Sequence, residues 1–220
     1  MDIEFASSYT LSLNGLDAKK IIVQAHIASG LPVFNIVGLA DKAVSESKER
    51  IRAALSSIAF ALPAKRITIN LAPANLMKEG SHFDLAITLT ILAALKIFPE
   101  KKIKEYLISS ELSLDGSLNR VNGILPTAIL ANKLNKGLIC AKENLAEAAI
   151  SGNKNIASFS NLLEVINFFR SDDIVIASNY TKPKIRQEES TNFKDIIGLK
   201  EAKRAFEIAA VGKHNILMIG

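Results

Sequence analysis

The sequence predicts an α/β fold (α+β) built around a mixed sheet. Segments with alternating apolar and polar residues are interleaved with helical stripes of apolar residues along residues 1–173. Two apolar-rich runs also flank Asp115 and Gly116, a pair that is typical of a β-hairpin. Because 49% of the 220 residues are hydrophobic, the chain can bury a sizeable core. Hairpins within an alternating order of strands and helices favour a mixed sheet over a purely parallel one.

The first part of this region predicts four strands and a helix. Alternation and β-branched residues indicate strands at residues 3–13, 21–27, 33–38 and 66–73, with turns at Asn14-Gly15 and Ser29-Gly30 and an end at Pro73. Residues on one helical stripe follow the third strand: Val44, Ile51, Leu55 and Ile58. Asp41 should cap that helix, and Glu46 and Arg50 should form a supporting i,i+4 ion pair.

The second part predicts the remaining elements in a similar alternation. We expect a hairpin around Asp115-Gly116, a helix from Pro126 to about Leu134, a strand at 137–141, a helix at 143–150, a strand at 156–159 and a helix through Phe169. Either Ser160 or Asn161 should cap the last of these helices.

The chain divides into three parts by composition. Residues 1–173 form the predicted domain, and residues 174–192 are polar, charged and poor in large apolar side chains, which indicates a linker. Residues 193–220 predict a helix at about 199–211 and an apolar strand at 214–219 that closes on Gly220. Such a strand often leads into a phosphate-binding loop, G-x-x-x-x-G-K-[ST], of which only the first position is present. One motif position of eight does not by itself identify residues 193–220 as the start of a P-loop domain.

Composition excludes several classes of protein. Cys140 is the only cysteine, so neither an intrachain disulfide nor a thiolate zinc site can form, and its apolar surroundings predict a buried strand position. The histidines, His26, His82 and His214, lack metal-ligand spacing, so no metal site is predicted. The chain starts without the pattern of a signal peptide and has no apolar run of about 20 residues, so we expect a cytoplasmic protein with no membrane partner.

The stretch KEGSHFDL, residues 78–85, could be an active site or the start of a helix. A serine needs a base within hydrogen-bond reach, and Lys78 is one candidate. A triad of Ser81, His82 and Asp84 is disfavoured because neighbours in sequence project in different directions. The pattern S-x-x-D is close to a capping box, in which Ser81 and Asp84 bond each other's backbone N–H groups. The residues therefore favour a helix start over a catalytic centre.

Basic residues near the strand at 66–73 could contact nucleic acid. Lys65, Arg66 and Lys78 flank this strand, and they could contact the phosphates of nucleic acid. The alternative is ordinary solvated charge, since Glu46, Glu49 and Glu79 lie among the basic residues of this part of the sequence. No aromatic residues interleave with the basic ones, so the sequence does not indicate a stacking platform for single strands.

Several long runs resemble one protein family. The run NFKDIIGLKEAKRAFEIAAVGKHNILMIG resembles the opening of the AAA+ module in the magnesium-chelatase-like ATPases, the YifB/ComM family. The runs GLPVFNIVGLADKAVSESKERIRAAL, PAKRITINLAPANLMKEGSHFDLAI and ELSLDGSLNRVNGILPTAILA resemble the amino-terminal domain of the same family, in family order. The resemblance covers most of residues 10–150 and 193–220.

This resemblance implies an ATPase that assembles as a homo-hexamer. Gly220 would be the first glycine of the P-loop, and Ile196, Ile197 and Gly198 would flank the adenine pocket. ATP and Mg²⁺ would be the cofactors of the full-length protein, with none bound by residues 1–220. The remainder of the loop, the acidic Mg²⁺ motif and the arginine finger are absent from this sequence, so these residues alone should not hydrolyse ATP.

The amino-terminal domain of that family resembles the Lon-protease domain, which has a ribosomal-protein-S5-domain-2-like fold. Matched to the Lon nucleophile loop, Lys78 and Gly80 fall on equivalent residues, His82 falls on the nucleophile and Ser81 lies one position early. Leu125 falls on the Lon catalytic lysine and cannot accept a proton. The resemblance therefore implies that both members of the Ser–Lys dyad are replaced and that the domain has no catalytic residue.

The function implied is that of a non-catalytic accessory domain in a ComM/YifB-type ATPase. The full-length protein would couple ATP hydrolysis to DNA remodelling, as a helicase or branch-migration motor in natural transformation and recombination. A divergent Lon-like serine peptidase remains an alternative, as does an ATP-driven motor that acts on a protein client or is related to magnesium chelatase.

Overall fold

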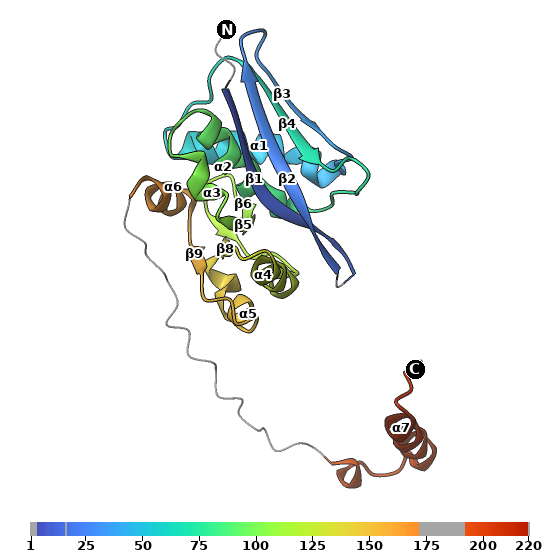
Figure 1. Cartoon of the computed structure of the whole chain (residues 1–220). Coiled ribbons are helices and arrows are strands. Elements are labelled where there is room, and N and C mark those ends of the chain that lie inside the picture. Colours follow the sequence, from blue (N-terminus) through green and yellow to red (C-terminus); the bar gives the residue numbers. More distant parts are fainter. Residues whose placement is uncertain (1–3, 16, 172–191, 220) are drawn as a thin grey trace. The chain divides into compact units, whose positions relative to one another are not determined.

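The computed structural model describes residues 4–15, 17–171 and 192–219, and the chain splits into two compact units, Met1–Lys182 and Pro183–Gly220 (Figure 1). Almost all of the predicted linker, residues 174–192, lies outside the described residues, and so does Gly220. Each unit is therefore considered by itself.

The first unit is built on a seven-stranded mixed sheet, as the sequence predicts. Its strands are β1 (Glu4–Asn14), β2 (Asp17–Ala28), β3 (Val33–Val37), β4 (Arg66–Ala72), β5 (Tyr106–Ser109), β8 (Gly137–Ala141) and β9 (Ile156–Phe159). Their order across the sheet is β3-β4-β2-β1-β5-β8-β9. The β1–β2 and β2–β4 pairs are antiparallel, and the other four pairs are parallel. A separate short hairpin joins β6 (Glu111–Leu112) to β7 (Leu118–Asn119) around Asp115-Gly116, which confirms that prediction.

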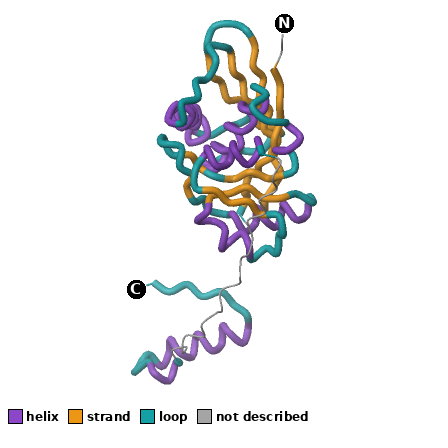
Figure 2. The backbone as a smooth tube through the Cα atoms, turned by 90° about the vertical axis from the view of Figure 1, so that its left-hand side faces the viewer, coloured by secondary structure: helices purple, strands orange, loops and turns teal. Residues whose placement is uncertain are grey.

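Helices cover the two faces of the sheet unequally. On one face lie α1 (Lys42–Ser57) and α2 (Asp84–Ala94), and a large core forms between them and the strands. On the other face, α4 (Ile124–Lys133) and α5 (Leu145–Ala149) pack with buried residues of β5, β8 and β9. The short helix α3 (Glu100–Ile103) and α6 (Leu162–Arg170) complete the unit, and the tube view shows helical segments packed beside the strands (Figure 2).

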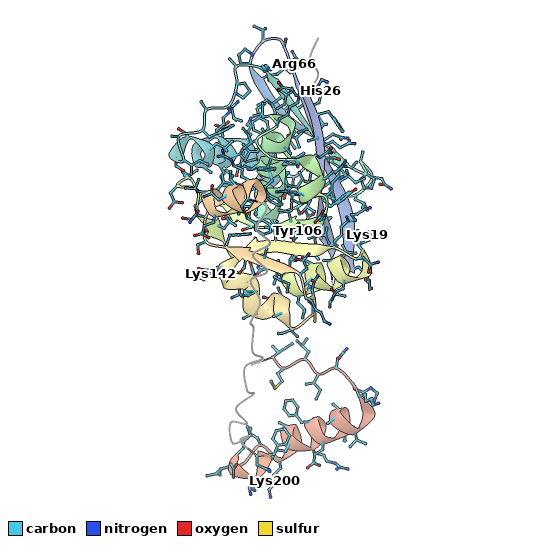
Figure 3. All side chains as sticks on the ribbon, turned by 60° about the vertical axis from the view of Figure 1, so that its left-hand side comes forward. Lys19, His26, Arg66, Tyr106, Lys142 and Lys200 are labelled. Carbon is cyan, nitrogen blue, oxygen red and sulfur yellow. The ribbon has the colours of Figure 1, made fainter. Side chains whose placement is uncertain are left out.

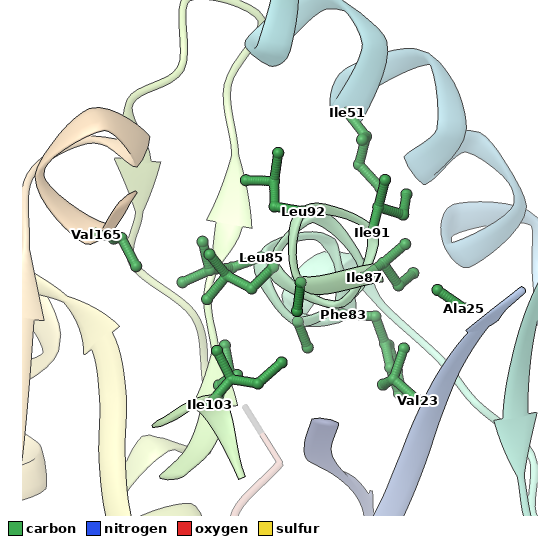
Figure 4. Close-up of a cluster of buried hydrophobic side chains, with 14 of the residues drawn as sticks. Val23, Ala25, Ile51, Phe83, Leu85, Ile87, Ile91, Leu92, Ile103 and Val165 are labelled. Carbon is green, nitrogen blue, oxygen red and sulfur yellow. The ribbon is translucent and has the colours of Figure 1, made fainter. Parts of the chain in front are cut away.

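Helix α2 lies at the centre of the main core (Figure 4). All of its eleven residues are buried, because it is apolar nearly all round and is enclosed by α1, the sheet and the β5–β6 segment. From Ile21 onward in β2, and from Arg66 in β4, buried residues instead alternate with exposed or partly exposed ones, so one side of each strand faces α2. The four strands β1 to β4 therefore present a second side that α1 and α2 do not cover.

The helix ends confirm some predictions and correct others. Asp41 caps α1 by accepting a bond from the Val44 N–H at 2.7 Å, and Asn161 rather than Ser160 caps α6. Helix α4 begins at Ile124 rather than Pro126, after Gly123 in a left-handed conformation. The helix expected at 143–150 is a 3₁₀ turn, Lys142–Asn144, followed by α5.

The predicted Glu46–Arg50 pair is wrong. The Glu46 carboxylate lies 3.7 Å from the Lys42 ammonium on the exposed side of α1, whereas the Arg50 guanidinium bonds the Asp84 carboxylate at the start of α2. A buried carboxylate gives the guanidinium a stronger partner than a solvated neighbour on the same helix does.

The second unit contains a 3₁₀ turn, Phe193–Asp195, and helix α7 (Lys200–Gly212). The Phe193 and Phe206 rings lie 5.7 Å apart, which holds the turn against the helix. The strand predicted at 214–219 is wrong for this structure: these residues follow α7 without strand pairing, and Leu217 is 84% exposed. An apolar run becomes a strand only where another strand supplies its hydrogen bonds, and the described part of this unit supplies none.

Candidate functional site

The loop that carries KEGSHFDL is held against the start of α1. The Lys78 N–H donates to the Leu39 carbonyl at 3.1 Å, and the Asp41 N–H donates to the Lys78 carbonyl at 3.0 Å. One Asp41 carboxylate oxygen caps α1, and the other accepts from the Gly80 N–H at 3.2 Å. A single side chain therefore fixes both the helix and the loop before Ser81.

Asp84 joins three elements from a fully buried position. Its carboxylate accepts bonds from the Arg50 Nε at 2.6 Å, from the Ser47 hydroxyl and from the Leu112 N–H at 3.3 Å. The bond to Asp84 raises the pKa of Arg50. The predicted capping box is wrong, because this carboxylate turns toward α1 and the β6–β7 hairpin instead of back to Ser81. The expectation that a helix starts here is confirmed.

The Ser81 hydroxyl faces a carboxylate. It donates to Glu111 Oε2, and the Asn119 side-chain amide, directly across the hairpin, donates to Glu111 Oε1 at 3.1 Å. The Lys78 side chain is fully buried and its ammonium donates to the Pro73 carbonyl, while burial lowers its pKa. Lys78 is therefore not the base of Ser81 in this structure.

His82 makes a separate contact. Its Nε2 lies 3.0 Å from the Leu11 carbonyl oxygen, and its ring lies 4.2 Å from the Phe83 ring. Burial lowers the pKa of His82, although the Leu11 carbonyl, Asp84 and Asp41 act in the opposite direction. The imidazole is thus neutral near pH 7 and braces β1 against the loop.

A cavity of about 340 Å³ opens beside this loop. Its lining comes from the loop, from β1 and from the segment after β7: Leu13, Glu79, Gly80, Ser81, His82, Glu111, Arg120, Val121 and Asn122. Leu125, half-buried in the first turn of α4, is not part of this lining. Sequence reasoning missed Glu111 and Arg120. The strong hairpin signal could have placed Glu111 opposite Asn119, but it could not show that the pair faces Ser81.

The three basic residues predicted to bind nucleic acid have different surroundings. Arg66 is exposed at the start of β4, and Lys65 lies 3.0 Å from the Glu4 carboxylate. The placement of Lys78 on a phosphate-binding surface was wrong, because the side chain is buried and bonded to Pro73. Of the three, Arg66 is exposed, Lys65 is paired with Glu4, and Lys78 is buried.

The residues predicted to flank adenine lie in the second unit, just before α7. Ile197 is 97% exposed, Ile196 is 41% exposed, and Gly198 adopts a φ of +80°. The Lys203 ammonium donates to the Ile196 carbonyl, which ties this segment to the helix. Gly220, the predicted first glycine of the P-loop, lies outside the described residues, so its role stays a prediction.

Other candidate groups are structural. Cys140 is buried in β8, as predicted, and burial raises the pKa of its thiol to about 12, so the thiolate needed for nucleophilic attack does not form near pH 7. Within residues 4–15, 17–171 and 192–219, no group of three His, Cys, Asp or Glu side chains is arranged to hold a metal ion. None of the helices in these ranges is long and apolar enough to cross a bilayer.

Comparisons with known proteins identify the family. The family described as subunit ChlI of Mg-chelatase matches residues 23–144, more than half of the chain. This chain belongs to the magnesium-chelatase-like ComM/YifB family. A second family description, magnesium chelatase, subunit ChlI, matches residues 192–220, so this ComM/YifB-family chain carries both regions in order.

Curated members of the family match the chain along nearly its whole length. Competence protein ComM of Haemophilus influenzae is 38% identical over 227 residues, which cover 99% of this chain and 44% of ComM. The uncharacterized protein YifB of Escherichia coli is 36% identical over 212 residues, covering 96% of this chain and 42% of YifB. The uncharacterized protein Rv2897c of Mycobacterium tuberculosis is 32% identical over 215 residues, covering 97% of this chain and 42% of Rv2897c. The chain spans less than half the length of these relatives.

The buried imidazole predicts a pH-dependent stability. Because the pKa of folded His82 is below its ordinary value of 6.5, the unfolded chain takes up a proton more readily as the pH falls through that value. Wild-type stability should therefore decrease between about pH 7.5 and about pH 5.5, and His82→Gln should show a smaller decrease over the same interval. Urea unfolding at the two pH values, followed by circular dichroism, measures both slopes. Equal decreases in the two proteins would rule out His82 as a contributor.

Proposed function

We propose that residues 1–173 form a non-catalytic accessory domain of a ComM/YifB-type AAA+ ATPase. The observation that carries this proposal is the partner of Ser81: its hydroxyl bonds the Glu111 carboxylate, and the amine of Lys78 is directed to Pro73 instead. Acyl transfer by serine requires a group that removes its proton, and a carboxylate is a weak base near pH 7. The mixed sheet and the buried α2 are in keeping with the proposed ribosomal-protein-S5-domain-2-like, Lon-like fold.

The second part of the proposal concerns the ATPase. Residues 192–220 match the magnesium chelatase description, which supports an ATP- and Mg²⁺-dependent domain in the longer protein. Ile196 and Ile197 expose apolar side chains just before α7, and such side chains can flank the adenine of ATP once further chain covers them. ATP would supply the energy for movement, and the residues that hold its phosphates and Mg²⁺ would follow Gly220.

The third part concerns the substrate. We propose that the longer protein acts as a hexameric ring on DNA, as a helicase or branch-migration motor in the cytoplasm during transformation and recombination. The relative named as a competence protein, which is 38% identical over 99% of this chain, supports this substrate over a protein client. The accessory domain would then help the ring assemble or hold the DNA.

A chimaera tests this function. The segment of Haemophilus ComM that aligns with this chain is replaced by residues 1–220, and ATP hydrolysis is measured with forked DNA, with four-way DNA and without DNA. We expect DNA to stimulate hydrolysis and ATP to drive strand separation, as in unaltered ComM measured beside the chimaera. Hydrolysis that a denatured protein stimulates and DNA does not would contradict the DNA assignment and favour a protein-remodelling motor.

A further inference from the structure

Much of one side of strands β1 to β4 is left open by the helices: α1 and α2 lie on the opposite side, while α3 contacts β1 and α4 contacts β2. The residues of β2 and β4 that face α2 are buried, and the residues between them point to the opposite side. We call this side the open face. It consists of these residues: Phe5, Lys20, Ile22, Gln24, His26, Ala28, Val33, Asn35, Val37, Arg66, Thr68, Asn70 and Ala72.

The strand register arranges polar side chains of the open face in rows. In one row, His26 pairs with Phe5 on β1 and with Thr68 on β4, and Thr68 pairs with Asn35 on β3. In the next row, Gln24 pairs with Asn70, and their side-chain amides bond at 2.8 Å. Partners across strands lie about 5 Å apart, so each row is a continuous line of hydrogen-bonding groups.

The charge of the open face has one sign. Its two formally charged residues, Lys20 and Arg66, are both basic, and no Asp or Glu belongs to it. Arg66 is exposed and pairs in register with Ala28 and Val33, at the end of the sheet next to the His26 row. Figure 3 shows the labelled His26 and Arg66 near each other at one end of the first unit. These two basic residues attract a polyanion, and the carboxylate that borders the face, Glu100 beside Ser7, is paired with the Lys104 ammonium at 2.6 Å.

Aromatic rings adjoin these rows. Phe5 is 54% exposed beside His26. Tyr9, two rows further along β1, has the Lys20 and Lys136 ammonium groups 5.0 and 4.6 Å from its ring centroid. The sequence did not indicate a stacking platform because these rings are far in sequence from Arg66, whereas the antiparallel β1–β2–β4 pairing places Phe5 in the row next to that of Arg66.

We propose that the open face binds single-stranded nucleic acid. Its amides, imidazole and hydroxyl can bond base edges that only an unpaired strand exposes, and Phe5 can stack on a base. Duplex DNA is bound mainly through many phosphate contacts, and two basic residues supply too few of them. The inference rests on the proposed DNA function and assigns to the accessory domain the unpaired strand that such a motor produces.

Fluorescence anisotropy with the 220-residue chain tests the open face. The probe is a short labelled single-stranded DNA of mixed sequence, compared with the same sequence as a duplex at low and physiological salt. His26→Ala combined with Arg66→Ala should weaken single-strand binding about tenfold or more, because a base contact and a phosphate contact are lost together. The control Lys142→Ala removes an exposed charge distant from Arg66 (Figure 3), and it should change affinity by less than about twofold.

A second pair of variants separates base contacts from charge. Asn35→Ala should lower the affinity for single-stranded DNA and leave its salt dependence unchanged. Arg66→Ala should instead reduce the slope of log affinity against log salt concentration by about one. Unchanged affinity in the double variant, tighter binding of the duplex, or self-association of the chain that the double variant abolishes would each overturn the inference.

The same double variant in the ComM chimaera keeps this inference apart from the proposed function. If it lowers DNA-stimulated ATP hydrolysis, the open face serves the motor as proposed. If DNA stimulates hydrolysis equally with and without the double substitution, the motor function stands and the open-face assignment falls. If DNA stimulates ATP hydrolysis neither in the chimaera nor in its double variant, the motor function falls. The anisotropy result alone then decides whether the open face binds single strands.

Discussion

Asp84→Ala is expected to lower the free energy of unfolding by about 3–5 kcal/mol. The carboxylate is fully buried and holds Arg50, Ser47 and the Leu112 N–H at once. Its removal leaves a guanidinium, a hydroxyl and a backbone donor without their shared partner, and each buried group then bears its desolvation cost. Urea unfolding of the 220-residue chain, followed by circular dichroism, measures the loss.

The matched control for Asp84 is Glu49→Ala on the same helix that carries Arg50. Glu49 bonds Arg52 at 3.1 Å on the exposed side of α1, and such a pair contributes at most about 1 kcal/mol. A loss at Asp84 no larger than the loss at Glu49 would show that the buried network does not join α1, α2 and the hairpin energetically.

Gly38→Ala is expected to lower the free energy of unfolding by about 3 kcal/mol or more, because it combines backbone strain with a clash. Gly38 has a φ of +110°, and a Cβ atom there would lie 2.3 Å from the Leu71 carbonyl oxygen. That oxygen belongs to β4 and cannot move without disturbing the sheet. The substitution should also displace Leu39, whose carbonyl accepts the bond from the Lys78 N–H.

Gly152→Ala separates the two causes at Gly38. Gly152 also has a positive φ, +73°, but a Cβ atom would meet nothing within 4 Å. Gly152→Ala should therefore lower the free energy of unfolding only by the strain of the left-handed conformation, about 1–2 kcal/mol. The midpoint of thermal unfolding should fall further for Gly38→Ala than for Gly152→Ala, and equal shifts would mean that the sheet accommodates the added methyl group.

Local patterns in the sequence predicted most of the first unit. Alternation located β2 and β4, and the Asp-Gly pair located the β6–β7 hairpin, because these features depend on neighbouring residues alone. Asp41 was predictable as a cap for the same reason. The Glu46–Arg50 pair failed because Arg50 had a better partner 34 positions away, which helical spacing cannot reveal.

The candidate site was less predictable because it depends on long-range contacts. The S-x-x-D pattern indicated a local capping box, yet Ser81 bonds Glu111 and Asp84 bonds α1. From the sequence, Lys78 is expected to be a surface cation. Only the folded loop after β4 shows that its side chain is buried. In the second unit, residues 214–219 have the composition of a strand but lack a pairing partner among the described residues.

Peptide cleavage by the purified chain tests the central claim most directly, because the claim is that the Ser81 loop has a structural and not a catalytic role. The wild-type chain and Ser81→Ala are incubated with casein and with a fluorogenic peptide, after unfolding measurements show that the variant is folded. The account predicts no cleavage by either protein, because Ser81 bonds a carboxylate and Lys78 is directed to Pro73. Cleavage by the wild-type chain that Ser81→Ala abolishes would contradict it.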